Sequence, residues 1–294
     1  MQLVKGIKLD NRMKKITLVT FFIVCLPFVS YAASIGGALT QGKGKFSVGI
    51  DSDYVFKKEF KNRNASGGFG GVATYNVGVH TEIKGGLYRE TVKLSYGIFD
   101  NLDIYAKVGM AQVIGIRQNI EGPLMFLGFP GALYGSADFQ SEVAPAYGAG
   151  IKGKINFPGR LSNLMLGCDT QYIRHKNRIN VSSWSSLYVT GFGLLAQTIA
   201  LDRGYITWEE WHAAPYLAYK IGNFVPYVGG KYSYARMKME LDTAVGFGAS
   251  NEKTGSKAGA FVGFDYLLGK HIDLNLEGRF IDETAVSGSF AYKF

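Results

Sequence analysis

The stretch that decides the fold is residues 272–294, IDLNLEGRFIDETAVSGSFAYKF, at the C-terminal end of the chain. Its first half has an apolar face of Ile272, Leu274, Leu276 and Phe280 and a polar face of Asp273, Asn275, Glu277 and Arg279. Side chains that alternate with period two point to opposite faces of a β-strand. The second half alternates in the same way, so we expect strands near 271–281 and 284–294. The polar face of the first requires water or ion pairs.

The same alternation recurs upstream through most of the chain, separated by turn residues. It predicts ten strands, with 12 or eight as alternatives because boundaries from such patterns are uncertain by several residues. Two further segments, 71–83 and 186–201, have enough β-branched and aromatic residues to form extra strands or extensions of hairpins. The ten expected strands lie near 45–57, 86–97, 101–114, 142–156, 162–175, 204–221, 224–240, 255–268, 271–281 and 284–294.

The connections between these strands alternate between short and long. Tight turns rich in Gly, Pro, Asn or Asp occur at 97–101, 157–160, 221–223 and 268–271. Longer polar or Gly-rich stretches, expected to be loops, lie around 58–85, 115–141, 176–203 and 241–254. Short turns on one side and long loops on the other are typical of a membrane barrel with an even number of strands.

The first 32 residues have the features of a signal peptide rather than of a folded element. Lys14 and Lys15 precede an apolar run, 16–29, and a small-residue cleavage site follows at Ser30-Tyr31-Ala32. The apolar run is too short for a membrane-spanning helix, which needs about 20 residues. We therefore expect residues 1–32 to be removed and residues 33–294 to form one domain, with Met1 or Met13 as the start.

Composition narrows the class of protein further. The chain has 39 Gly, 18 Tyr and 20 Phe beside 7 Pro, and the part after the leader has no long uncharged apolar run, which excludes a helical membrane protein. The leader carries five Lys and Arg residues and one Asp, so the formal net charge of +9 falls to +5 without it. The remaining positive charges are scattered, which argues against a nucleic-acid partner. Cys168 alone remains after cleavage, so no internal disulfide is expected.

The last five residues carry a resemblance to a known class. Phe290, Tyr292 and the terminal Phe294 alternate as in the C-terminal signature of bacterial outer-membrane β-barrel proteins. The resemblance implies an all-β fold, a transmembrane antiparallel up-and-down barrel in the cell outer membrane. It also implies that the barrel assembly machinery recognises this last strand and that the strand closes the ring against the first one.

In such a barrel, every strand edge must be paired because hydrocarbon offers no hydrogen-bond partners. Outer-membrane lipid would contact the apolar face of each strand. Aromatic residues near strand ends would form a girdle at the membrane interfaces. The expected girdle residues are Tyr96, Phe99, Phe157, Phe224, Tyr227 and Phe294.

Residues 209–212, Glu-Glu-Trp-His, are the densest candidate for chemistry. On a strand, Glu210 and His212 share one face, and they point into the lumen if Trp211 faces lipid. A carboxylate beside an imidazole could act as a general base. Ten-stranded outer-membrane proteases of the omptin type use acidic residues with a His at the outer rim, but the Asp51 and Asp53 pair here lies on the first strand without the surrounding pattern. We expect an ion pair in the lumen rather than catalysis.

The inward charges of both signs suggest that side chains fill the lumen. Small barrels fill their interior in this way, whereas open aqueous channels need about 16 strands. The four His residues are too dispersed to indicate a metal site, and no cofactor is expected. The predicted charge network of the lumen consists of Asp51, Lys107, Glu210, His212, Lys231, Asp265, Asp273, Glu277 and Arg279.

The sequence therefore predicts a structural or surface-interacting protein of the outer membrane without catalytic activity. Its long loops are where we expect an extracellular ligand to bind. Two alternatives remain open from the sequence: a narrow-channel porin or transporter, and a hydrolase at the rim of the barrel.

Overall fold

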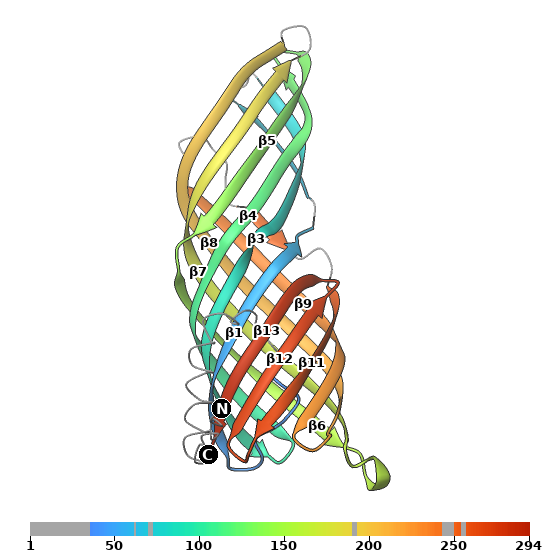
Figure 1. Ribbon diagram of the computed structural model, residues 1–294. Helices are drawn as coiled ribbons and strands as arrows, with labels where there is room; N and C mark the ends of the chain where they lie inside the picture. The colour runs from blue at the N-terminus through green and yellow to red at the C-terminus, as the bar shows by residue number, and fades with distance from the viewer. Residues whose placement is uncertain (1–35, 62, 70–72, 190–192, 243–249, 254–256) are drawn as a thin grey trace, which may run out of the picture. The chain divides into compact units, whose positions relative to one another are not determined.

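The computed structural model describes residues 36–61, 63–69, 73–189, 193–242, 250–253 and 257–294 (Figure 1). The predicted leader, residues 1–32, lies outside these described residues. Nearly all of the described chain is antiparallel β-structure, interrupted by a short 3₁₀ turn at Gly159–Leu161. In this part of the chain no helix is long and apolar enough to cross a membrane.

The described residues form one 13-stranded sheet. Its strands are β1 (Phe46–Glu59), β2 (Arg63–Phe69), β3 (Ala73–Phe99), β4 (Leu102–Phe126), β5 (Phe129–Ser141), β6 (Ala144–Asn156), β7 (Leu164–Val189), β8 (Gly193–Tyr219), β9 (Phe224–Asp242), β10 (Ser250–Lys253), β11 (Ala258–Leu268), β12 (Ile272–Phe280) and β13 (Glu283–Lys293).

These strands make ten antiparallel runs around a closed ring, because three of the runs consist of two strands in succession. β1 and β2 both pair with β3, β5 and β6 both pair with β4 and β7, and β10 and β11 both pair with β9. The ring closes where β1 pairs with β13, from Ser47↔Lys293 to Lys58↔Glu283. The predicted ten-stranded antiparallel barrel is confirmed, rather than eight or 12 strands.

The prediction of long loops was wrong for most of the residues concerned. The stretches 58–85, 115–141 and 176–203 are mainly strand, and β3, β7 and β8 reach 26 or 27 residues each. Glycine, serine and threonine lower the mean hydropathy of these stretches, which is why they were predicted to be loops. They form strands because the hydrogen bonds between strands join backbone groups, whatever the side chains. In 241–254 the structure describes the end of β9 and β10.

The described parts of 71–83 and 186–201 extend hairpins, as the alternative prediction allowed. The predicted tight turns at 97–101, 157–160, 221–223 and 268–271 are found at the end where β1 begins and β13 ends, which we call the short-turn end.

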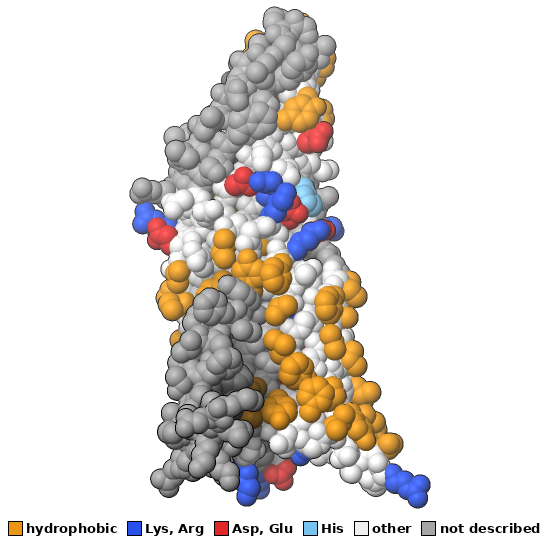
Figure 2. All heavy atoms as spheres, viewed as in Figure 1, with side chains coloured by type: hydrophobic (Ala, Val, Ile, Leu, Met, Phe, Trp, Pro, Cys, Tyr) orange, Lys and Arg blue, Asp and Glu red, His pale blue; other side chains and the backbone are white. Residues whose placement is uncertain are grey.

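The outer and inner faces exchange character along the barrel axis. In the part near the short turns, large apolar side chains such as Leu94, Val108 and Ile151 are exposed on the outside, below a band of charged side chains (Figure 2). In the long hairpins, apolar side chains such as Val79, Ile116 and Ile206 are buried inside, and most charged side chains lie outside, with Glu252 as an exception. In β1 and β4 a register irregularity lies between the two parts, so the inward positions change from odd to even numbers along these strands.

Most of the predicted girdle residues lie on the outer face. Tyr96, Phe99 and Phe224 are exposed, and Phe294 stacks on Phe46 with ring centroids 4.3 Å apart across the closing seam. The prediction for Tyr227 was wrong, because this residue is inward and 3% exposed. Alternation explains its parity, since Phe224 faces outward and a residue an odd number of positions along the same strand faces the other side.

Side chains fill the interior in layers. The long hairpins enclose an apolar layer that includes Phe60, Phe139, Trp208 and Met237. Near the short turns, a smaller apolar cluster of Tyr216, Tyr227 and Phe261 packs around Ala38. Ala38 belongs to residues 36–41, which precede β1 and lie inside the ring. Buried charged side chains make up the layers between these apolar groups.

Candidate functional site in the barrel lumen

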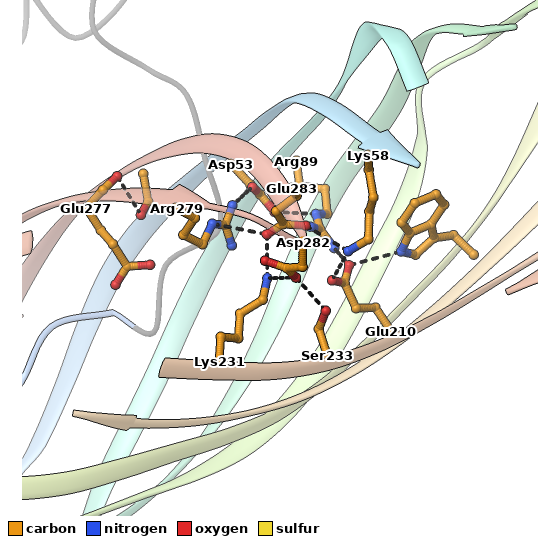
Figure 3. Close-up of polar contacts among 12 residues, drawn as sticks. Asp53, Lys58, Arg89, Glu210, Lys231, Ser233, Glu277, Arg279, Asp282 and Glu283 are labelled. Atoms are coloured by element: carbon orange, nitrogen blue, oxygen red, sulfur yellow. Dashed lines mark hydrogen bonds and ion pairs between the residues drawn. The ribbon is translucent and has the colours of Figure 1, made fainter. Parts of the chain in front are cut away.

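A cluster of eight ionisable side chains lies within the barrel, at the level of the turn between β12 and β13 (Figure 3). We call it the upper network. Each of its side chains is at most 3% exposed. The network consists of Asp53, Lys58, Arg89, Glu210, Lys231, Arg279, Asp282 and Glu283.

Glu283 is the carboxylate with the most cationic partners in this network. Its Oε2 lies 2.7 Å from Lys58 Nζ, and its Oε1 lies 2.5 Å from Lys231 Nζ and 3.2 Å from Arg279 Nε. The three cations come from β1, β9 and β12, so one carboxylate at the start of β13 connects distant parts of the wall.

Glu210 occupies the opposite side of the network on β8. Its Oε1 accepts a hydrogen bond from Lys58 Nζ at 2.8 Å. Its Oε2 accepts hydrogen bonds from Arg89 at 3.0 Å and from Trp208 Nε1 at 3.2 Å. Both oxygens of this carboxylate are therefore engaged by neighbouring donors.

Asp53 links the two arginines. Arg279 donates to Asp53 Oδ1 at 2.8 Å, and Arg89 forms an ion pair with Asp53 Oδ2. Lys231 also approaches Asp282 at 3.2 Å.

The turn that supplies Asp282 and Glu283 is strained. Ile281 has a φ of 81° and is 76% exposed. A β-branched residue in the left-handed region is unfavourable, so the surrounding contacts must hold it there. Asp282 accepts a hydrogen bond from Ser233 at 2.6 Å, which is one such contact. The strained turn is what directs two successive carboxylates into the lumen.

The upper network contains four cations and four carboxylates. Taking an ion out of water costs several kcal/mol, and partners must compensate each charge. The equal numbers of opposite charges therefore make burial of the whole group possible, whereas removal of one member would leave a buried charge without compensation.

A second group, the lower network, lies nearer the short turns. Lys107 pairs with Asp51 at 2.9 Å, and Lys152 lies 3.6 Å from Asp169. Asp169 also accepts a hydrogen bond from Tyr105 at 2.5 Å, and Lys93 lies 4.2 Å from the centroid of the Tyr105 ring. These contacts join β1, β3, β4, β6 and β7 across the lumen.

Residues 36–41, which precede β1, are bonded to the lower network. Lys152 Nζ donates to the carbonyls of Gly36 and Gly37 at 2.8 and 2.7 Å, and the Ala38 amide donates to Asp265 Oδ2 at 2.7 Å. A Cβ on Gly37 would overlap the Asp265 carboxylate, and the φ of Gly37 is 85°. Only glycine fits this position without displacement of the segment.

The structure distributes the sequence-predicted network residues over these two groups. Glu210, Lys231 and Arg279 belong to the upper network. Asp51, Lys107 and Asp265 belong to the lower one. The remaining three lie on the same inward faces: Glu277 accepts a hydrogen bond from Tyr227 at 3.1 Å, Asp273 pairs with Lys293 at 3.0 Å, and His212 is 6% exposed.

The strand geometry predicted for residues 210–212 is also found. Trp211 is 59% exposed on the outside, while Glu210 and His212 are buried inside. Asp51 and Asp53 share the inward face of β1, but their partners differ, because Asp51 contacts Lys107 and Asp53 contacts the arginines. No group of side chains suited to hold a metal ion occurs among the described residues.

The predicted lumen network left out five of the eight residues of the upper network, and Asp53 among them was noted only as a neighbour of Asp51. Lys58 fell in a presumed loop, and a register shift between Val55 and Lys57 turns it inward where strict alternation would have selected Lys57. Asp282 and Glu283 lay in a presumed turn. Arg89 could have been predicted from the sequence, because alternation from Lys93 through Thr91 places it on the inward face.

Comparison with known proteins shows the fold of the chain. No known protein family and no curated protein matches the sequence. Among solved structures, the outer-membrane protease OmpT from Escherichia coli is similar with a TM-score of 0.51 and 11% identity, over 89% of this chain and 100% of that one. At this identity the likeness shows the barrel fold alone.

Two other outer-membrane structures have lower similarity. The toluene transporter TodX from Pseudomonas putida has a TM-score of 0.31 at 11% identity, over 90% of this chain and 93% of that one. The outer-membrane protein OprG from Pseudomonas aeruginosa has a TM-score of 0.27 at 9% identity, over 86% of this chain and 98% of that one. The structural neighbours are thus bacterial outer-membrane β-barrel proteins.

Proposed function

We propose that this chain is an integral outer-membrane barrel with a closed lumen and no catalytic activity, which acts through the hairpins that it displays outside the membrane. The observation that carries the proposal is the filling of the lumen. The upper network, the lower network and the apolar layer of the long hairpins occupy successive levels of the interior. The barrel fold and the apolar outer belt support the outer-membrane location.

The residual space at the short-turn end supports a closed lumen. A pocket of about 20 Å³ remains there, bordered by Gly36, Asp51, Lys93 and Asp273. This volume is sufficient for about one water molecule and not for a hydrated solute. The proposal therefore assigns the buried charges a role in stability and strand register rather than in transport.

The surroundings of Glu210 and His212 argue against catalysis at this pair. Glu210 has both oxygens engaged by Lys58, Arg89 and Trp208. A general base must reach a substrate proton within hydrogen-bond distance. Because these two side chains are at most 6% exposed, a substrate would have to displace part of the packed interior.

The purified chain in a planar lipid bilayer is expected to give no steady conductance, because the networks block the lumen. A general porin inserted under the same conditions is the positive control. Folding is verified beforehand by different migration of boiled and unboiled samples on a denaturing gel. Reproducible single-channel steps from folded protein would overturn the closed-lumen proposal in favour of a narrow channel.

A second experiment tests the membrane location. Trp211 faces outward at 59% exposure, whereas Trp208 is fully buried inside. The parent chain carries Trp184→Phe, so that its fluorescence comes from these two residues alone. In vesicles of brominated phospholipid, adding Trp211→Phe is expected to remove most of the bromine-dependent quenching, and adding Trp208→Phe is expected to keep it. If the Trp211→Phe variant is quenched as strongly as its parent, the outer belt does not face lipid.

A further inference from the structure

The hairpin of β4 and β5 ends in an apolar tip on the side away from the short turns. Outward residues along β4 are first polar, Arg117, Asn119 and Glu121, and then change to Pro123 and Met125. Near the turn, the exposed side chains are apolar: Met125 is 46%, Leu127 62% and Phe129 49% exposed. Above the charged band, the outward residues of the other described hairpin segments are mainly polar, for example Asn76 and Arg178.

Charge is absent from this tip over a long stretch. Residues 122–137, GPLMFLGFPGALYGSA, contain no Asp, Glu, Lys or Arg. Charges return at the base of the hairpin, where Arg117 Nε donates to Asp138 Oδ1 at 2.8 Å and a second guanidinium nitrogen donates to Oδ2 at 3.2 Å. The hairpin thus has an uncharged apex above a charged base.

The turn has Leu127 at a position with positive φ, where a leucine is unfavourable for folding. Leu127 has a φ of 50° and Gly128 a φ of 86°. Such two-residue turns favour Asn-Gly, because Asn tolerates the left-handed region better than Leu. An exposed Leu in that position therefore costs stability, and strain of this kind points to a role outside the fold.

In the other three long hairpins, the sequence that connects the two strands also contains Phe next to Gly and lacks charged residues. Each contains Phe between two glycines, at 68–70, 191–193 and 246–248, and the β4–β5 tip has Gly128-Phe129-Pro130. The surrounding stretches 64–81, 179–201 and 243–251 contain no Asp, Glu, Lys or Arg. All four hairpin sequences thus have a Gly-Phe pair within an uncharged stretch.

We propose that the apolar tip of the β4–β5 hairpin inserts into a second lipid bilayer that faces the cell. The inference rests on the proposed function, in which the hairpins outside the membrane make the contact, and it identifies a lipid bilayer as the partner. A bilayer interior accepts only backbone groups that are already paired. The tip meets this condition, since β4 and β5 pair up to Phe126↔Phe129 and β5 pairs with β7 from Gly131↔Val189 onward.

The chemistry of the tip favours lipid over a protein or a glycan. Residues 123–130, PLMFLGFP, contain no side chain that donates or accepts a hydrogen bond. Protein interfaces carry about one hydrogen bond per 100–200 Å². The charged base, with Glu121 and the Arg117–Asp138 pair, would then remain in the aqueous layer at the bilayer surface.

The test uses the full chain in lipid nanodiscs mixed with phosphatidylcholine vesicles, followed by flotation. The unmodified chain is expected to float with the vesicles. A double variant, Leu127→Asn with Phe129→Ser, is expected to lower the bound fraction at least about tenfold, because two large apolar side chains are lost from the buried tip. The introduced asparagine would precede Gly128 in a favoured Asn-Gly turn, so the hairpin keeps its fold.

Ile281→Asn is the matched control. Ile281 is also an exposed apolar residue in a hairpin turn with positive φ, but it lies on β12–β13 outside the tip. This variant is expected to bind vesicles like the unmodified chain. Absence of vesicle binding by the unmodified chain, or equal binding by the double variant, would overturn the bilayer as partner. A conducting barrel would overturn the proposed function itself, whatever the vesicle result.

Discussion

A Glu283→Gln variant is expected to lower the free energy of unfolding by about 3–5 kcal/mol, the usual range for a buried ion pair that loses one partner. Glutamine keeps the volume of the side chain but removes its charge. Lys58, Lys231 and Arg279 would then share fewer negative charges in a site that excludes water. Denaturant titration of the folded chain in lipid vesicles measures this change.

Glu240→Gln is the control for the same chemical change on the surface. Glu240 contacts Lys238 at 2.5 Å and Lys176 at 3.5 Å outside the barrel. The hydrogen bond and charge of Lys238, together with Lys176, lower the pKa of Glu240, so it is ionised at neutral pH. Water screens exposed pairs, and we expect no measurable change in unfolding. Equal effects of the two substitutions would contradict a central role for the upper network.

The second large effect is expected from Trp208→Ala. Trp208 is fully buried, contacts Phe60 edge-to-face with ring centroids 5.6 Å apart and stacks on His175 at 6.0 Å. Truncation of a buried Trp leaves a cavity and costs about 3–5 kcal/mol. The Glu210 carboxylate would also lose the indole N–H as a donor. The same denaturant titration in vesicles provides the measurement.

Trp211→Ala tests whether burial rather than residue type causes this loss. Trp211 lies further along β8 on the outer face and packs against Tyr172 with ring centroids 4.5 Å apart. Because Trp211 is on the outer face, its truncation leaves no internal cavity, and in the proposed membrane location lipid can fill the space. A loss for Trp211→Ala as large as that for Trp208→Ala would show that the apolar layer of the long hairpins is not the source of the stability.

Both experiments address the same physical arrangement, in which polar and apolar layers alternate inside a barrel. A buried ionic layer is weak evidence for high stability, because apolar side chains of equal size can stabilise as well. Its clearer consequence here is register. Glu283 contacts cations on three strands, and a shift of β13 by one residue would turn Glu283 outward and leave these cations without it.

The sequence by itself determined the barrel wall in the part near the chain ends. The strand from Ile272 to Arg279 can face either way, and only one orientation puts its apolar face against an apolar medium. The position of the strand and its inward residues follow from that choice. The same logic predicted nine inward side chains of the lumen. It assigned most of the upper half to loops because these stretches are polar or rich in glycine, and it left only 71–83 and 186–201 as possible strands or hairpin extensions.

Only the tertiary structure decided which charges meet. Lys58 faces inward because of a bulge in β1, and Asp282 and Glu283 do so because of the strained turn at Ile281. Neither feature follows from a period of two, since each is a local departure from it. Ion pairs between β1 and β13 or between β1 and β8 join residues 225 and 152 positions apart. Closure of the ring brings such distant residues together, and no local pattern contains that information.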